Sequence, residues 1–213
     1  MTINCIIDTC SCICLSNSEF NQKTLLELLH KKVSLNYSKE IHVELRDHKD
    51  KNLPKFIHDE RLRKKTRKYP MDEYERRMLG NVLISRVKKG DKGEIDNFLL
   101  SVDQIHHTKI NSLIFITDDK KALRGVLADW ITCFPAIKIW SSFEVILYLY
   151  AESVIPSKDI AMEKIKDIIF FTAPSLADRK QKTPEELNKT SQALIALTKD
   201  YSNRIEKISL LLK

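Results

Sequence analysis

The chain has 213 residues, of which 43% are hydrophobic, and its formal net charge is +7. This length and composition can build one sizeable core plus an appendage, which excludes a largely disordered protein, and no apolar run approaches the roughly 20 residues that cross a bilayer. The five cysteines are an odd number and no signal peptide precedes the first apolar run, so we expect a reduced cytoplasmic protein without a membrane partner.

Strand and helix patterns alternate along the first two thirds of the chain. Short apolar runs predict strands over residues 2–7, 33–35, 112–117 and 136–140. Apolar residues at helical spacing predict helices over residues 19–32, 39–45, 94–105 and 119–129. Such alternation is typical of an α/β fold, with a central parallel sheet flanked by helices. Residues 106–109, which include two histidines, are expected to form a surface loop.

A basic, polar segment interrupts this pattern over residues 46–92, where the net charge is +8. We expect a basic helical insert here that grips the backbone of a polyanion, with a solvated helical face as the alternative. The predicted nucleic-acid-binding residues are Arg61, Arg63, Lys64, Lys65, Arg67, Lys68, Arg76 and Arg77.

Strand patterns end at about residue 153, so we divide the chain into a domain over residues 1–153 and a helical C-terminal extension over residues 154–213. A helix is predicted from Ser157 to Phe171. Thr183-Pro184-Glu185-Glu186 has the sequence of a capping box and predicts the start of a last, long helix. Its apolar stripe packs on the rest of the chain or forms a contact with a partner.

Carboxylates follow two of the predicted strands directly: Asp8 follows the first, and Asp118 and Asp119 follow the strand at 112–117. If these strands are neighbours, the carboxylates meet at the carboxyl edge of the sheet, where open α/β sheets bind ligands. Like charges at short range need a cation or a proton, and an all-oxygen set favours Mg²⁺ or Mn²⁺. The alternative is that each acid caps the helix that follows it.

Four short motifs resemble those of PIN-domain nucleases, over roughly residues 2–150. They are Ile6-Ile7-Asp8-Thr9, the helix-borne Glu44, Gly93-Glu94-Ile95-Asp96 and Ile116-Thr117-Asp118-Asp119. The resemblance implies a PIN-like three-layer fold and cleavage of RNA with Mg²⁺ or Mn²⁺.

The resemblance also implies which residues act. The catalytic acids are Asp8, Glu44, Glu94, Asp118 and Asp119, and the metal ligands are these five together with Asp96. Glu94 and Asp96 lie about 200° apart around a helix, so we expect one of them, preferably Glu94, to enter the site. We expect Thr9 and Thr117 to orient either the acids or the substrate through hydrogen bonds of their hydroxyls.

These features predict a metal-dependent endoribonuclease that hydrolyses phosphodiester bonds of single-stranded or structured RNA, with a toxin or defence effector as one possible role. An antitoxin, or a second copy of the chain, is then a candidate partner for the C-terminal helices. The alternative is a catalytically inactive PIN-like RNA-binding or scaffold protein. A phosphotransfer protein is disfavoured because Asp8-Thr9-Cys10 supplies one carboxylate, and the spacing Cys10-x-Cys12-x-Cys14 disfavours a zinc site.

Overall fold

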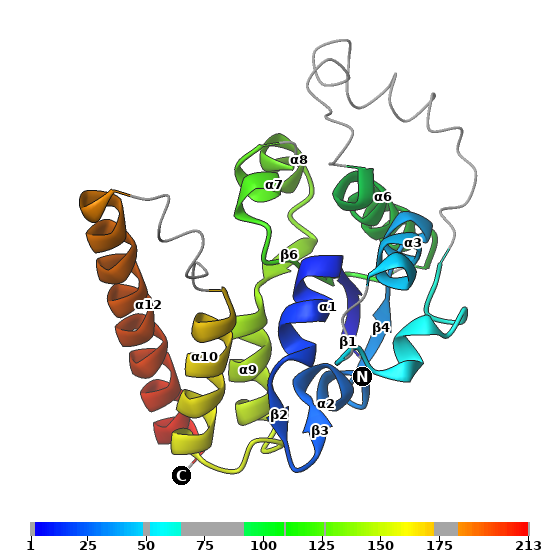
Figure 1. Cartoon of the computed structure of the whole chain (residues 1–213). Coiled ribbons are helices and arrows are strands. Elements are labelled where there is room, and N and C mark those ends of the chain that lie inside the picture. Colours follow the sequence, from blue (N-terminus) through cyan, green and yellow to red (C-terminus); the bar gives the residue numbers. More distant parts are fainter. Residues whose placement is uncertain are drawn as a thin grey trace. The chain divides into compact units, whose positions relative to one another are not determined.

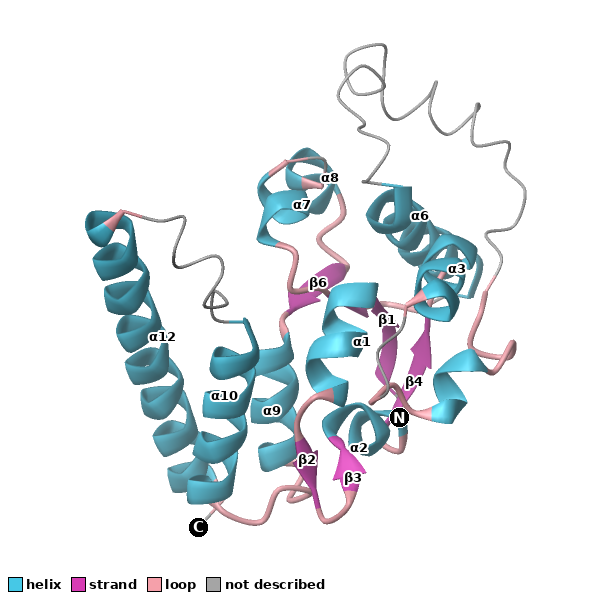
Figure 2. Ribbon diagram, in the orientation of Figure 1, coloured by secondary structure: helices cyan, strands magenta, loops and turns pink. Residues whose placement is uncertain are grey.

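The computed structural model describes residues 3–48, 52–64, 92–108, 110–125, 127–172 and 183–212. The chain has an α/β fold with a central parallel sheet of four strands flanked by helices, followed by C-terminal helices (Figures 1 and 2). It divides into two compact units, one made of residues 1–13 and 30–141 and the other of residues 14–29 and 142–213. The predicted domain boundary at residue 153 stays a prediction.

The sheet of the first unit has the strand order β4-β1-β5-β6, and every pair is parallel. Its strands are β1 (Ile3–Ile7), β4 (Val33–Asn36), β5 (Leu113–Ile116) and β6 (Ile137–Trp140). All four predicted strands are therefore confirmed. Ile7 is paired with Ile116, so β1 and β5 end at the same level, and the residues that follow them come out side by side.

Helices connect these strands, as parallel pairing requires. Those that lie wholly or mostly in the first unit are α1 (Thr9–Ser16), α3 (Lys39–Asp47), the short 3₁₀ helix η1 (Lys55–His58), α6 (Lys92–Thr108), α7 (Lys120–Arg124) and α8 (Ala128–Cys133). Ser38 is the N-cap of α3, because its hydroxyl accepts a hydrogen bond from the backbone N–H of Ile41.

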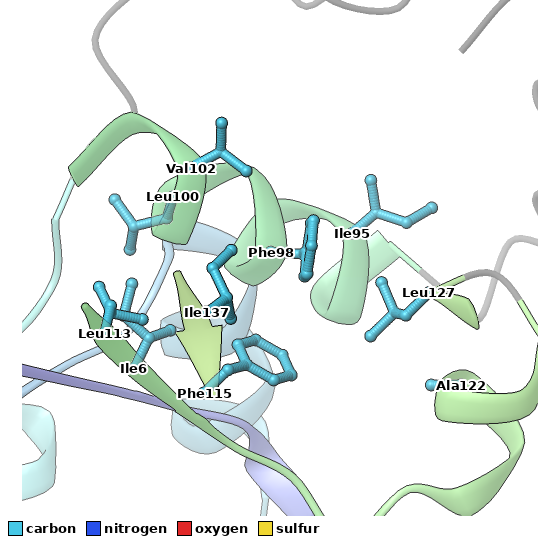
Figure 3. Packing of buried hydrophobic residues seen from close by; sticks show 10 residues of the cluster. All are labelled: Ile6, Ile95, Phe98, Leu100, Val102, Leu113, Phe115, Ala122, Leu127 and Ile137. Atoms are coloured by element: carbon cyan, nitrogen blue, oxygen red, sulfur yellow. The ribbon is translucent and has the colours of Figure 1, made fainter. Parts of the chain in front are cut away.

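The apolar face of α6 forms the core of this unit together with the sheet (Figure 3). Phe98 is fully buried and meets Phe115 of β5 edge to face, with 6.1 Å between the ring centroids. Ile95 and Val102 extend this face by one turn on either side, and Ile137 of β6 joins the same cluster. The helical spacing of apolar residues that the sequence predicted for this segment is therefore the spacing of the residues that α6 buries in the core.

The helix predicted over residues 19–32 is wrong in its first half. Residues Glu19–Phe20 and Lys23–Thr24 form an antiparallel hairpin, β2 and β3, and the helix α2 covers only Leu25–His30. Asn21 and Gln22 adopt positive φ angles of 51° and 59°, the conformation that a two-residue hairpin turn requires. The first helix is instead α1, directly after β1.

Two other boundaries also differ from the predictions. Helix α6 continues to Thr108, so the loop expected over residues 106–109 is helical for most of its length. The helix predicted over residues 119–129 is interrupted at Gly125, whose φ of −107° and ψ of −109° lie outside the helical region. The segment therefore forms two short helices, α7 and α8.

The second unit is dominated by three helices that pack on one another: α9 (Ser142–Ala151), α10 (Lys158–Thr172) and α12 (Pro184–Leu211). The capping box at Thr183 is confirmed, with Glu186 returning its side chain to the Thr183 backbone N–H. Tyr201 of α12 stacks on Phe143 of α9 at 4.8 Å, so this part of the predicted apolar stripe packs within the unit. None of the described helices combines the length and apolarity needed to cross a membrane.

Candidate active site

Asp8 leaves β1 into the first turn of α1 and is almost fully buried, with 1% of its surface exposed. Its backbone N–H donates to the Ile116 carbonyl of β5 at 3.1 Å, which holds it at the edge of the sheet. Its Oδ1 accepts from the Ser11 backbone N–H at 2.7 Å, the geometry of a helix cap. Its Oδ2 accepts a short hydrogen bond from the Thr117 hydroxyl.

Burial raises the pKa of Asp8 to about 7. The hydrogen bonds from Thr117 and Ser11 lower the pKa, and the negative charge of Asp118 raises it further. Burial dominates this balance, so the carboxyl holds its proton close to neutral pH unless a positive charge offsets the burial. Asp8 is therefore both a helix cap and a strongly perturbed acid, which is a combination typical of functional sites.

Thr117 connects the end of β5 to the ends of both neighbouring strands, β6 and β1. Its backbone N–H donates to the Trp140 carbonyl at 2.9 Å, and its buried hydroxyl donates to Asp8. The same hydroxyl accepts from the Asp119 backbone N–H at 3.1 Å. The predicted orienting role of this hydroxyl toward an acid is thus seen as a hydrogen bond.

Asp118 and Asp119 have different local roles. Asp119 caps α7, accepting from the backbone N–H groups of Lys121 at 2.7 Å and Ala122 at 3.0 Å. Asp118 accepts from the Ser11 hydroxyl at 2.9 Å, across from α1. The capping alternative therefore holds for Asp119 as it does for Asp8, while Asp118 is held by a side chain of another element.

Glu44 reaches the same region from α3. Its Oε2 accepts a hydrogen bond from the Thr9 hydroxyl, one residue after Asp8. A Cβ atom on Gly93, at the start of α6, would lie 2.5 Å from Glu44 Oε1 and 2.8 Å from Cδ1 of Ile41. Gly93 therefore permits the close approach of α3 and α6, and Glu44 occupies the space that a side chain at residue 93 would need.

Several acids act electrostatically on the thiol of Cys10, which lies in the first turn of α1 and is exposed at the surface. Partial desolvation and the charges of four carboxylates, those of Asp8, Asp119, Glu94 and Asp118, raise its pKa to about 12. These carboxylates come from β1, β5 and α6. We call them, together with Glu44, the acidic cluster.

Glu94 and Asp96 have different neighbours, as expected from their angular separation. The charge of Glu94 acts on Cys10, whereas Asp96 Oδ2 accepts from the Glu40 backbone N–H in the first turn of α3 at 3.3 Å. Asp96 thus meets an amide donor at the start of a helix, a position that favours negative charge.

The donor chemistry of the acidic cluster fits Mg²⁺ or Mn²⁺, because all its members are carboxylates. Among the described residues, however, no three His, Cys, Asp or Glu side chains lie close enough together to hold one ion. Asp8 is fixed by its burial, while Glu44 is exposed and Glu94 is partly exposed. Metal binding would therefore require some of these side chains to rearrange.

Three of the predicted basic residues lie in the described part of the insert. Arg61 forms a two-pronged ion pair with Asp59, its closest contact being 2.6 Å, and Arg63 lies 3.7 Å from Glu60. Lys64 is exposed. Backbone pairing with Tyr37 holds this segment just beyond the carboxyl end of β4. The other predicted contacts, Lys65, Arg67, Lys68, Arg76 and Arg77, lie outside the described residues.

Two contributors to the site were not predicted from the sequence. Ser11 forms hydrogen bonds with both Asp8 and Asp118. In the sequence this role is indicated only weakly, by a hydroxyl three residues after the acid that follows β1. Asn97 of α6 is fully buried and bonds both β1 and the start of α3. The one sequence feature that could have indicated this role is an amide on the apolar face of a predicted helix.

Comparison of the chain with protein-family models gave no match, and comparisons with curated proteins and with solved structures gave none either.

The convergence of the acids can be tested through Cys10, in metal-free buffer. Removing a nearby negative charge lowers the pKa of the thiol. Each pKa unit by which it falls raises the thiolate fraction about tenfold. We expect peptide-resolved alkylation of Cys10 at pH 8 to be several-fold faster in Asp119→Asn and in Glu94→Gln than in the wild type. Asp47→Asn, an exposed acid at the end of α3, is the control and should leave the rate unchanged. Equal rates in all four proteins would show that the acids do not surround this thiol.

The burial of Asp8 predicts an unusual dependence of stability on pH. Its folded-state pKa of about 7 lies above the usual value of 3.8 for an aspartate, so its contribution to stability is complete below about pH 4 and is lost as the pH rises through 7. Asp8→Asn carries no such charge. In EDTA, the free energy of unfolding of Asp8→Asn minus that of the wild type should therefore increase by up to about 4 kcal/mol between pH 4 and pH 8. A difference that is independent of pH in denaturant titrations would contradict a buried, perturbed carboxyl.

Proposed function

We propose that this protein is a metal-dependent endoribonuclease of the PIN-like type, which hydrolyses RNA phosphodiester bonds at the acidic cluster. The observation that carries the proposal is the hydrogen-bonded arrangement of acids at the ends of β1 and β5, where Ser11 bonds both Asp8 and Asp118 and Thr117 donates to Asp8. Thr9, the residue after Asp8, also bonds Glu44 of α3. Acids at the carboxyl edge of a parallel sheet support a ligand site there.

Asp8, Glu44, Glu94 and the Asp118-Asp119 pair are the residues that would hold Mg²⁺ or Mn²⁺. The bound ion would lower the pKa of a water molecule and stabilise the charge that develops on the phosphate. Asp96 is the weakest candidate ligand, because its carboxylate already meets the start of α3.

The protein's own residues prepare the carboxylates through hydroxyl groups. Thr117 donates to Asp8, Ser11 donates to Asp118, and Thr9 donates to Glu44. Each bond fixes the direction of one carboxylate, and the bond from Thr117 also lowers the pKa of Asp8 against the effect of its burial. Because Asp8 is buried, the gain from pairing it with a cation is large, which favours cation binding over an empty, protonated state.

The basic insert supplies the affinity for RNA in this proposal. Its excess of positive charge attracts phosphates without regard to sequence, and Lys64 lies exposed close to the carboxyl end of β4. A toxin or defence effector is one role for such an enzyme, with an antitoxin or a second copy of the chain meeting the C-terminal helices.

A second candidate function is a PIN-like RNA-binding or scaffold protein without turnover. It is favoured by the finding that no three metal-binding side chains in the described part of the chain are assembled for one ion. RNA binding without cleavage, combined with no heat of Mn²⁺ binding, would select this candidate over the nuclease.

Removal of one acid should abolish RNA cleavage if the proposal is correct. We expect Asp8→Asn and Glu44→Gln each to lower the cleavage rate in Mn²⁺ at least about 100-fold, as loss of a charge-stabilising group does in other enzymes. Asp47→Asn removes an acid from the same helix as Glu44 and should cleave at the wild-type rate. Cleavage of labelled RNA at wild-type rate by both acid variants would refute the nuclease proposal.

Gly93→Ala tests whether the position of Glu44 matters. The added methyl group would displace the flexible end of Glu44 and also press on the buried Cδ1 of Ile41, so the free energy of unfolding should fall by about 1 to 2 kcal/mol although alanine favours the helix. We expect cleavage to fall about tenfold, with no further loss when Gly93→Ala is combined with Glu44→Gln. Additive losses in the double variant would mean that residue 93 acts independently of Glu44.

A further inference from the structure

Asn97 is a fully buried amide that bonds backbone groups of two other elements. Its Nδ2 donates to the Ile7 carbonyl at 2.7 Å, and its Oδ1 accepts from the Ser38 backbone N–H at 2.8 Å. Burying an amide is costly unless such bonds form, so the two bonds compensate for its presence beside the apolar core.

One bonded group directly precedes a member of the acidic cluster, and the other caps the helix that carries a second member. Ile7 is the last residue of β1, and Asp8 follows it. Ser38 is the N-cap of α3, the helix that carries Glu44. Asn97 itself lies on α6, one turn after Glu94. One side chain therefore connects the three elements from which these acids come.

The chemistry of the two bonds requires an amide. The carbonyl of Ile7 needs a donor, and the N–H of Ser38 needs an acceptor. A carboxylate supplies no donor and an aliphatic side chain supplies neither, whereas asparagine supplies both within one short side chain. A further hydrogen bond, from the Glu40 backbone N–H to Asp96, also connects this turn of α6 to the start of α3.

We propose that Asn97 is a positioning residue, which holds the start of α3 against the end of β1 and so sets the separation of Asp8 and Glu44. Its consequence for metal binding rests on the proposed function, whereas the mechanical connection does not. Replacing a residue that orients metal ligands commonly lowers metal affinity 10- to 100-fold.

Ser101 provides a matched control for a merely structural role. It is also fully buried on α6, but its hydroxyl donates to the Asn97 carbonyl within its own helix, at 2.9 Å. Ser101→Ala therefore removes a buried hydrogen bond from the same helix without disconnecting α3 from β1.

The first measurement is amide hydrogen exchange of the full chain in EDTA. In Asn97→Ala we expect the Ser38 amide to exchange at least about tenfold faster than in the wild type, while Ser101→Ala leaves it within about twofold. If Asn97→Ala does not fold, Asn97→Leu keeps a similar volume, removes both bonds and should give the same result. An unchanged Ser38 amide, or equal acceleration in the Ser101 variant, would overturn the proposal.

The second measurement is calorimetric titration with Mn²⁺. We expect the Asn97 variant to bind at least about tenfold more weakly than the wild type, and Ser101→Ala to bind within about twofold of it. Equal affinity in the two variants would overturn the positioning role. If the wild type itself binds no Mn²⁺, the proposed function fails, and hydrogen exchange alone then decides whether Asn97 holds α3 to β1.

Discussion

The hydrogen bond from the Thr117 hydroxyl to the Asp8 carboxylate is the interaction on which the site depends. It forms because β1 and β5 are adjacent, parallel and end at the same level, so that the next residues of both strands face each other. Thr117 also receives the Asp119 N–H and thereby connects Asp8 to the start of α7. The other acids are arranged around this pair by Ser11, by Thr9 and by the close approach at Gly93.

Helix capping and catalysis compete as explanations for the same carboxylates, and the two are compatible here. Asp8 and Asp119 both accept from backbone amides of the helices that follow them. Capping alone does not explain why Asp8 is buried at 1% exposure beside Asp118, since an exposed cap would avoid that electrostatic cost. Burial of an acid close to others of the same charge is the feature that favours a cation as a partner.

The sequence predicted the parts of the fold that local patterns determine. The apolar runs before Asp8 and Asp118 identified two adjacent strands, and Thr183 with Glu186 identified the start of α12. Helix α1 was missed because its residues are largely buried and lack a polar face at helical spacing. The hairpin at Asn21 was missed because Leu25, Leu28 and Leu29 suggested a longer helix.

The roles of Ser11 and Asn97 were beyond prediction, because their bonds join residues far apart in the chain. Ser11 and Asp118 are separated by 107 positions, and Asn97 and Ile7 by 90.

The most direct test of a cation-binding acidic cluster is the anomalous scattering of a crystal soaked in Mn²⁺. We expect a peak at coordination distance from Asp8 and from at least one acid of β5 or α3. A fully ordered acidic cluster without a peak, or a peak only at unrelated surface acids, would contradict it.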